Sequence, residues 1–171
     1  MNDARVLSTI SEPRFTSLLV KNRQTAKDIA GLMLTAEKQS RDDAKRIAKF
    51  FKAPTVYGTC QRIFYFLKKH VPYEREPSDK QSAKTVSRII SDARKGYGND
   101  CKHYATFAVS ILKNLGINGN FRLVSFYENQ NPTHAYAVAK DGAQTYIIDA
   151  CLDYFDKETR YKRKYDIKPL N

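Results

Sequence analysis

The sequence predicts a single α+β domain in which a helical N-terminal half packs beside a small antiparallel sheet. Apolar residues recur at intervals of three and four as far as residue 116, as they do in helices that bury one face. After residue 120 they occur instead in three short extended runs. A chain of 171 residues can bury a core without disulfides or metal ions, and no repeat or low-complexity linker indicates a second domain.

Four stretches of helical periodicity precede residue 97. Their expected ranges are 25–38, 40–51, 55–71 and 82–94. Ser40 opens the second stretch and stands three residues before Asp43, as an N-cap residue does. Pro72 ends the third stretch because proline cannot continue a helix, and a polar loop over residues 74–81 follows it.

A run of turn-forming residues, "GYGND" at 96–100, precedes a fifth helix. This helix is expected to begin at Cys101 and to be capped by Gly116. Cys101 therefore falls in the first turn, near unpaired backbone N–H groups and the positive end of the helix dipole. Such surroundings favour the thiolate form of a cysteine, which makes Cys101 a candidate nucleophile.

The extended runs that follow cover residues 121–127, 134–140 and 145–150. Asp141-Gly142, between the last two runs, is a strong hairpin signal. A two-residue turn that pairs residue 140 with 143 would place His134 directly opposite Asp149. A longer loop that pairs 140 with 145 would leave the two residues diagonal to each other on the same face. Either register brings an imidazole and a carboxylate together.

A thiol at a helix start, an imidazole and a carboxylate are the groups that nucleophilic acyl chemistry requires. In this arrangement His134 takes the proton of Cys101 and later delivers it to the leaving group. Asp149 holds the imidazole in the correct tautomer through the other ring nitrogen.

These residues lie in the stretches "GNDCKHYATFAVSILKNLGINGNFRLVSF", "THAYAVAKDG" and "YIIDAC". Together with "IFYFLKKHVPY" upstream, the stretches resemble the catalytic core of the transglutaminase-like superfamily over about residues 55–155. The resemblance implies a papain-like core with Cys101, His134 and Asp149 in the catalytic positions. It also implies a cysteine-dependent hydrolase or acyltransferase that acts on amide bonds of a protein or peptide through a thioester, as a protease, peptidase, deamidase or transglutaminase-type enzyme.

The chain departs from the family pattern around the oxyanion site. The family usually has an aromatic residue, often tryptophan, two residues after the histidine, whereas this chain has Tyr136 and no tryptophan. The backbone N–H of Cys101 remains as an oxyanion donor, and Gln61 or Gln81 can supply a second. No cofactor is implied, and no acidic cluster resembles a calcium loop.

Positive charge is unevenly distributed along the chain, whose formal net charge is +12. Residues 101–156 carry four lysines and arginines against five acidic residues, whereas residues 157–168 carry six against two. We accordingly divide the domain into a helical region (1–54), a core (55–155) and a basic C-terminal tail (156–171). The tail can contact nucleic acid or an anionic surface weakly, but a solvated extension is the simpler interpretation.

The N-terminus and the cysteines indicate the compartment. The first fifteen residues lack the apolar core of a signal peptide, and no stretch has the ~18 apolar residues of a membrane span. The three cysteines cannot all pair with one another and show no CxxC spacing, which favours a reducing compartment. We therefore expect a cytoplasmic protein, or a virion-associated one, since the chain most resembles small stand-alone family members of bacteria and phages.

The remaining histidines and cysteines have simpler interpretations. His103 stands two residues after Cys101 on the same helix and so points away from it. His70 lies at a helix end and is interpreted as a solvated residue. Cys60 and Cys151 are interpreted as structural residues.

Two other classes of function stay open. A zinc site could be built from Cys101, His103, Cys151 and His134, but these residues lack the paired spacing of structural zinc sites. Alternatively, the chain is a non-catalytic transglutaminase-like scaffold with a structural, nucleic-acid-binding or virion-binding role. The complete triad favours the enzyme, because degenerate family members usually lose one of the three residues.

Overall fold

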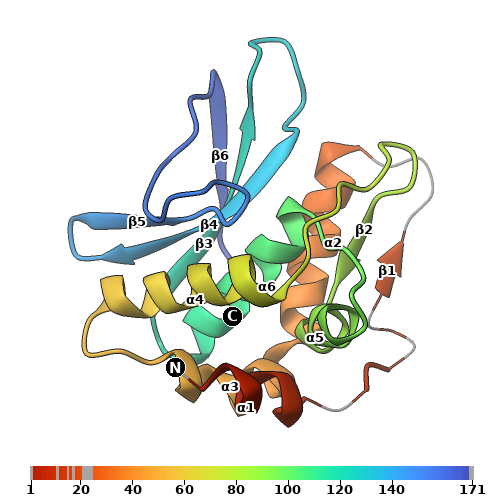
Figure 1. The fold of residues 1–171 in the computed structure, drawn as a ribbon. Helices are drawn as coiled ribbons and strands as arrows, with labels where there is room; N and C mark the ends of the chain where they lie inside the picture. Colours follow the sequence, from red (N-terminus) through yellow and green to blue (C-terminus); the bar gives the residue numbers. More distant parts are fainter. Residues whose placement is uncertain (1, 11, 15, 17, 21–24, 170–171) are drawn as a thin grey trace.

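A computed structural model of the chain describes residues 2–10, 12–14, 16, 18–20 and 25–169. The helices of this part are α1 (Asp3–Thr9), α2 (Ala26–Gln39), α3 (Arg41–Phe51), α4 (Val56–His70), α5 (Val86–Arg94) and α6 (Cys101–Asn114). The strands are β1 (Leu18–Val20), β2 (Ser82–Lys84), β3 (Asn118–Ser125), β4 (His134–Asp141), β5 (Gln144–Ile148) and β6 (Arg163–Ile167). The α+β class predicted from the sequence is confirmed (Figure 1).

Helix α6 is the centre of the molecule. It lies between the other helices and a four-stranded antiparallel sheet of order β5-β4-β3-β6 (Figure 1). Every residue of α6 from Lys102 to Leu112 is buried, because α2, α3, α4 and α5 contact it on one side and β3 and β4 on the other. The first residue of this helix is therefore held at a fixed place beside the end of the sheet.

The helices agree with the sequence prediction except at two places. Residues 82–84 were expected to begin a helix, but they form β2, which pairs with β1 in a separate antiparallel sheet. The helix itself begins only at Val86, after the side chain of Thr85 accepts a hydrogen bond from the backbone N–H of Arg88. Helix α1, which the periodicity did not indicate, buries Val6 in the main core.

The β4–β5 hairpin adopts the second of the two registers considered from the sequence. Lys140 pairs with Thr145 and Asp141 pairs with Gln144, so that the turn consists of Gly142 and Ala143. Gly142 has φ 58°, a conformation that favours glycine at the first turn position. His134 and Asp149 therefore lie diagonally on one face.

The expected solvated tail is in part an edge strand of the sheet. Strand β6 pairs with β3 from Phe121 to Ser125. The side chain of Arg122 is nearly buried and forms a two-pronged ion pair with Asp166, at 2.6 and 2.7 Å. A buried guanidinium needs carboxylate partners, so Arg122 holds β6 against the sheet. The interpretation of residues 156–171 as a solvated extension is therefore wrong for residues 163–167, which form β6. Residues 170 and 171 of that tail lie outside the described residues.

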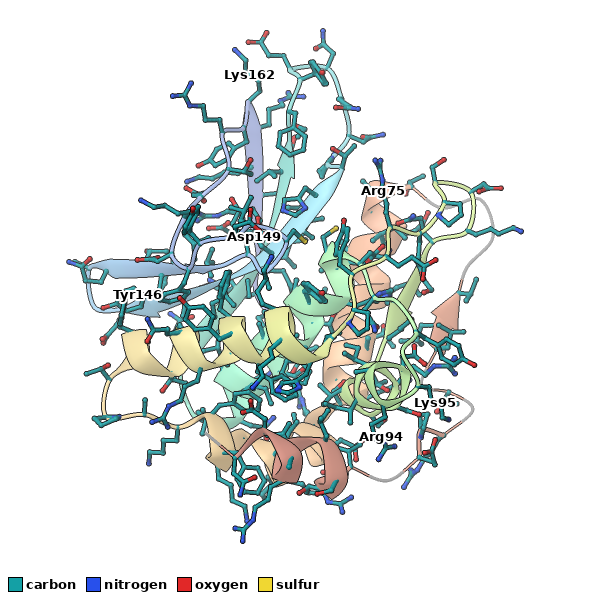
Figure 2. All side chains as sticks on the ribbon, in the orientation of Figure 1. Arg75, Arg94, Lys95, Tyr146, Asp149 and Lys162 are labelled. Atoms are coloured by element: carbon teal, nitrogen blue, oxygen red, sulfur yellow. The ribbon has the colours of Figure 1, made fainter. Side chains whose placement is uncertain are left out.

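The exposed edge of the sheet is strongly basic. Lys162, Arg163 and Lys164 are exposed, and Figure 2 shows Lys162 at the outer end of β6. Charged side chains on an edge strand oppose pairing with strands of other molecules. Among the described residues, no helix has both the length and the apolar character needed to cross a bilayer.

Candidate active site

The turn before α6 is attached to the segment that follows α4. The backbone N–H of Asn99 donates to the carbonyl of Pro72 at 2.8 Å, and that of Glu74 donates to the carbonyl of Asn99 at 3.0 Å. Gly98 has to be glycine here, because a Cβ at this position would overlap the side chain of Glu74. These contacts fix the backbone that leads into Cys101.

A buried polar network lies beneath the start of α6. Lys102, only 3% exposed, forms ion pairs with Glu76 (2.9 Å) and with Asp100. Burial raises the pKa of the Asp100 carboxyl, and the charge of Lys102 opposes this rise. The network thus joins the N-cap of α6 to the loop at residues 74–81 and limits the movement of Cys101.

His103 belongs to this buried network. Its Nδ1 accepts a hydrogen bond from the backbone N–H of Asp100 at 3.1 Å, and its Nε2 lies 3.2 Å from the carbonyl oxygen of Ser82. Complete burial and the nearby charges of Lys102 and Lys84 lower its pKa well below 6.5. Both ring nitrogens are engaged, so His103 cannot serve as the base for Cys101.

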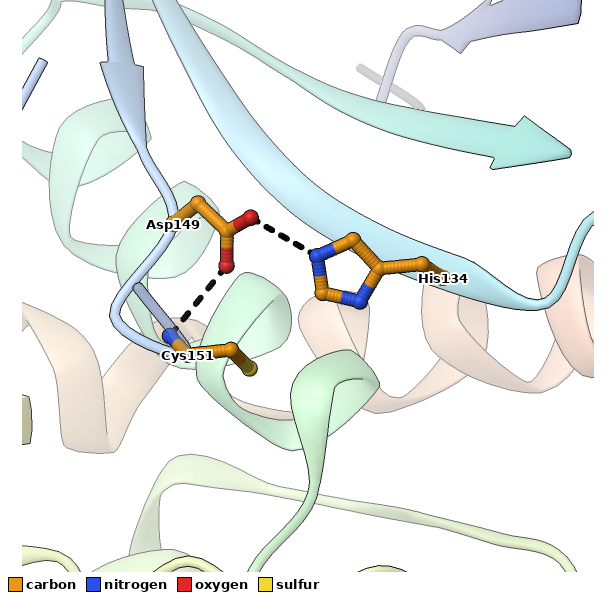
Figure 3. Close-up of side chains that lie close together, drawn as sticks. All are labelled: His134, Asp149 and Cys151. Atoms are coloured by element: carbon orange, nitrogen blue, oxygen red, sulfur yellow. Dashed lines mark hydrogen bonds and ion pairs between the residues drawn. The ribbon is translucent and has the colours of Figure 1, made fainter. Parts of the chain in front are cut away.

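His134 and Asp149 form the hydrogen bond that the hairpin argument predicts. His134 is the first residue of β4, and Asp149 directly follows β5. Nε2 of His134 lies 2.7 Å from Oδ2 of Asp149 (Figure 3). The other carboxylate oxygen accepts the backbone N–H of Cys151 at 3.2 Å. Asp149 is 2% exposed, so these two donors hold it in one orientation.

The other nitrogen of the ring is left for Cys101. Cys101 and His134 line one cavity, and the thiol interacts electrostatically with the imidazole, whose Nδ1 is the nitrogen that does not face Asp149. Burial lowers the pKa of His134, but the hydrogen bond with Asp149 and the charges of Asp149 and Cys101 outweigh burial and raise that pKa from 6.5 to about 10. Phe126 stacks on the ring, with centroids 6.3 Å apart. The structure therefore brings all three predicted residues together.

A cavity of about 650 Å³ opens over these residues. One wall is formed by the segment after α4, including Tyr73 and Gln81, and the other by the β3–β4 loop, including Tyr127. Gln81 thus lies at the site, although its amide nitrogen donates to the carbonyls of Glu76 (3.1 Å) and Pro77 (2.9 Å). Gln61 lines a separate pocket beside Asp3 and cannot be an oxyanion donor for Cys101.

Sequence reasoning missed two residues of this cavity, Cys151 and Tyr73. A ring nitrogen of His134, a carboxylate oxygen of Asp149 and Sγ of Cys151 all lie within 4.8 Å of one another (Figure 3). Burial and the neighbouring Asp149 and Cys101 raise the pKa of the Cys151 thiol. Continuing the observed strand register beyond Ile148 would have placed residue 151 opposite residue 134.

The Tyr73 side chain lines the same cavity as Cys101 and Cys151. Burial, Cys151 and Cys101 raise its pKa to about 12. Its ring packs edge-on against Tyr104, whose hydroxyl donates to the carbonyl of Val71 at 2.6 Å. The position of Tyr73 was not predictable from periodicity, because it depends on the bridge between Tyr73 and Asn99.

Comparison with known proteins agrees with this geometry. The sequence model of the Transglutaminase-like superfamily matches residues 41–158, which is more than half of the chain. The chain belongs to the transglutaminase-like superfamily. A comparison with curated proteins finds no significant match.

Two solved structures are similar to this superfamily member. One is a candidate cysteine protease from Cytophaga hutchinsonii, with 18% identity and a TM-score of 0.46 over 72% of this chain and 42% of that one. The other is described as a TGase, with 12% identity and a TM-score of 0.38 over 82% of this chain and 36% of that one. The chain thus spans less than half the length of either protein.

Proposed function

We propose that this chain is a cysteine-dependent hydrolase or acyltransferase that acts on amide bonds. Cys101 is the nucleophile, His134 is the general base and acid, and Asp149 orients the imidazole. The observation that carries this proposal is the 2.7 Å contact between Nε2 of His134 and Asp149, which leaves Nδ1 for Cys101 in the same cavity. One ring nitrogen is thus fixed by a carboxylate, and the other is free to take the thiol proton in the proposed reaction.

The reaction then proceeds in two halves. His134 takes the thiol proton, and the Cys101 sulfur attacks the carbonyl carbon of the substrate amide. The tetrahedral intermediate breaks when His134 gives the proton to the departing amine, which leaves a thioester on Cys101. Water or an amine, deprotonated by His134, attacks the thioester and restores the thiol.

Two donors face the oxyanion in this proposal. The first backbone N–H groups of a helix lack intrahelical partners, so the N–H of Cys101 is one donor. We assign the second to the Tyr73 hydroxyl, because Tyr73 lines the same cavity as Cys101 while the amide nitrogen of Gln81 donates to backbone carbonyls. Tyr73→Phe should lower kcat by about 10²-fold. Tyr127→Phe, which alters the same cavity from the other wall, should leave kcat within about twofold.

Turnover of the purified chain tests the whole proposal. Release of peptides from a labelled protein, release of ammonia, and incorporation of a fluorescent primary amine separate the protease, deamidase and transglutaminase reactions. We expect one of these activities, and Cys101→Ala should reduce it by at least about 10³-fold. Cys60→Ala is the matched control, because Cys60 is completely buried in the main core. Activity that survives in the Cys101→Ala variant would show that the triad does not carry the reaction.

Alkylation of the three thiols is a test that needs no substrate. Burial raises the pKa of Cys60 to about 12 and also raises that of Cys151. Iodoacetamide near pH 6 should therefore label Cys101 first, by at least about tenfold, and His134→Ala should slow this labelling. Equal labelling of the three cysteines, read by mass spectrometry of peptides, would favour a non-catalytic scaffold.

A further inference from the structure

A second, smaller cavity of about 100 Å³ lies beside the proposed nucleophile. Cys101 and His134 line both this cavity and the larger one, so the two adjoin at the proposed reacting groups. We propose that the small cavity binds an aliphatic side chain on the acyl side of the substrate and thereby selects leucine-like residues. This inference rests on the proposed function, because it names the substrate class of the same site. The acyl part stays bonded to Cys101 in the thioester, so its side chains can reach a cavity that borders this residue.

The walls of the small cavity come from elements that lie far apart in the sequence. The first turns of α2 lie beside the start of β4 (Figure 1), and β3 contributes the rest of the apolar wall. Leu123 and Ala135 are direct partners in the β3–β4 register, so their side chains share one face of the sheet. The apolar residues that line the cavity are Ala26, Ile29, Met33, Leu123, Pro132 and Ala135.

The α2 wall is fixed at both ends. Thr25 and Asp28 form a capping box at the start of the helix, in which the backbone N–H of Thr25 donates to Asp28 at 2.9 Å. Met33, only 1% exposed, holds the following turn in the main core. Ile29 lies between these two points and is partly exposed. A cavity that is already formed binds a side chain without the cost of ordering its own walls.

The volume and the polar neighbours of the cavity favour an aliphatic group. An apolar cavity of about 150 Å³ holds benzene, so a volume of about 100 Å³ suits about three or four carbons better than an aromatic ring. Lys102 also lines the cavity, but its ammonium is paired with Glu76 and Asp100. The amide nitrogen of Gln81 donates to the carbonyls of Glu76 and Pro77. Because these groups already have partners, leucine is favoured over asparagine, which has the same branched shape.

Methyl NMR tests the cavity without any reaction. The full-length Cys101→Ala chain, labelled at its isoleucine methyl groups, is titrated with acetyl-leucyl-alanine amide and with acetyl-asparaginyl-alanine amide. The Ile29 signal is identified by its loss in the Ile29→Ala variant. We expect the leucine peptide to shift this signal and to bind at least about tenfold more tightly than the asparagine peptide. Equal binding of the two peptides, or binding that leaves Ile29 unmoved, would overturn the proposed role of the cavity.

Peptidyl chloromethyl ketones connect the cavity to Cys101. The thiolate of Cys101 displaces chloride from the reagent, so that a carbon–sulfur bond forms and chloride leaves. Reagents with leucine or asparagine at the first or second residue before the ketone are compared by mass spectrometry of the Cys101 peptide. We expect leucine to raise the labelling rate at least about tenfold at one of these positions. Ile29→Phe should fill the cavity and reduce the preference to about twofold or less, whereas Ile29→Ala should enlarge it and transfer the preference to phenylalanine.

A matched variant and the two readouts separate the possible outcomes. Leu32→Phe should keep the leucine preference, because Leu32 lies on α2 but is not among the residues that line either cavity. Circular dichroism should show that every variant is folded. Equal labelling of Cys101 by the leucine and asparagine reagents would contradict only the role of the cavity, since the thiol would still react. A leucine peptide that binds at Ile29, with no labelling of Cys101 by any reagent, would contradict only the proposed function.

Discussion

Two histidines lie near the start of α6, each beside an aspartate, and their surroundings give them opposite properties. His103 is completely buried, next to Lys102 and Lys84, and its pKa is far below 6.5. His134 opens onto a cavity and meets Asp149 and a thiol, and its pKa is raised to about 10. The first ring is a neutral structural element, while the second can hold and release a proton. The histidine nearer to Cys101 in sequence is therefore the one whose environment makes it unsuitable as a base.

The largest expected effect comes from removing each ring in turn. His134→Ala should lower turnover by about 10⁴-fold or more, because the thiol loses its base and the leaving group its acid. His103→Ala should instead reduce the free energy of unfolding by about 2–5 kcal/mol, because it leaves the Asp100 N–H and its other polar neighbours unpaired in the interior. Activity assays and urea unfolding of both variants measure the two effects. A His103→Ala variant that is stable but inactive would reverse the assignment.

The next effect concerns Asp149, the carboxylate that holds the His134 ring. Asp149→Asn keeps the shape of the side chain but removes the charge that stabilises protonated His134. We expect kcat to fall by roughly 10²–10⁴-fold with little change in KM. Steady-state kinetics checks this, with Asp153→Asn as the control because Asp153 is exposed and pairs only with Lys68 at 3.3 Å in the described part of the chain. Equal losses in both variants would point to a general charge effect.

The hairpin shows why the candidate triad was predictable. A one-residue slip changes the face of every side chain, but both registers allowed by the turn keep His134 and Asp149 on one face. The start of the helix at Cys101 was also predictable from nearby residues, because the turn residues directly before it mark a helix boundary. These features need only neighbouring residues, which is why sequence reasoning reached them.

The features that sequence reasoning missed depend on distant partners. Strand β6 is held by the carboxylates that Arg122 requires, and these lie 36 and 44 residues further along the chain. His103 has a structural role because Ser82 and the N-terminus of α6 enclose it. Cys151 was interpreted as structural, although it lines the same cavity as Cys101. In each case the pattern around the residue is ordinary, and a tertiary contact determines its role.

The pH dependence of stability separates the two histidines further. The pKa of His134 is raised in the folded chain, so its ion pair contributes stability fully below about pH 6.5, and this contribution is lost as the pH rises through about 10. His134→Gln should therefore lower the free energy of unfolding more at pH 6 than at pH 10.5. His103 has a lowered pKa, so the folded chain should lose stability as the pH falls below 6.5 and the unfolded histidine takes up a proton. Guanidinium unfolding across this range measures both, and a His134→Gln effect that does not change with pH would contradict the charged pair.

The smallest effect on catalysis is expected at the basic edge, which is separated from β4 by β3. Lys162, Arg163 and Lys164 are exposed, and replacing all three with Gln keeps the backbone hydrogen bonds of β6. Deleting the segment would be a poor test, because it would also remove the partners of Arg122. Turnover and Cys101 alkylation should stay within about twofold in the triple variant.

The same variant tests whether the edge binds nucleic acid, the alternative to a solvated extension that the charge pattern left open. If it does, each lost phosphate contact should reduce the slope of log affinity against log salt on duplex DNA by about 0.9. Fluorescence anisotropy with a labelled duplex at several salt concentrations measures this slope, and Cys101→Ser is the control that should leave it unchanged. The triad and the basic edge would then be independent. Loss of turnover in the triple variant, with an unchanged salt slope, would instead mean that the edge contributes to the candidate active site.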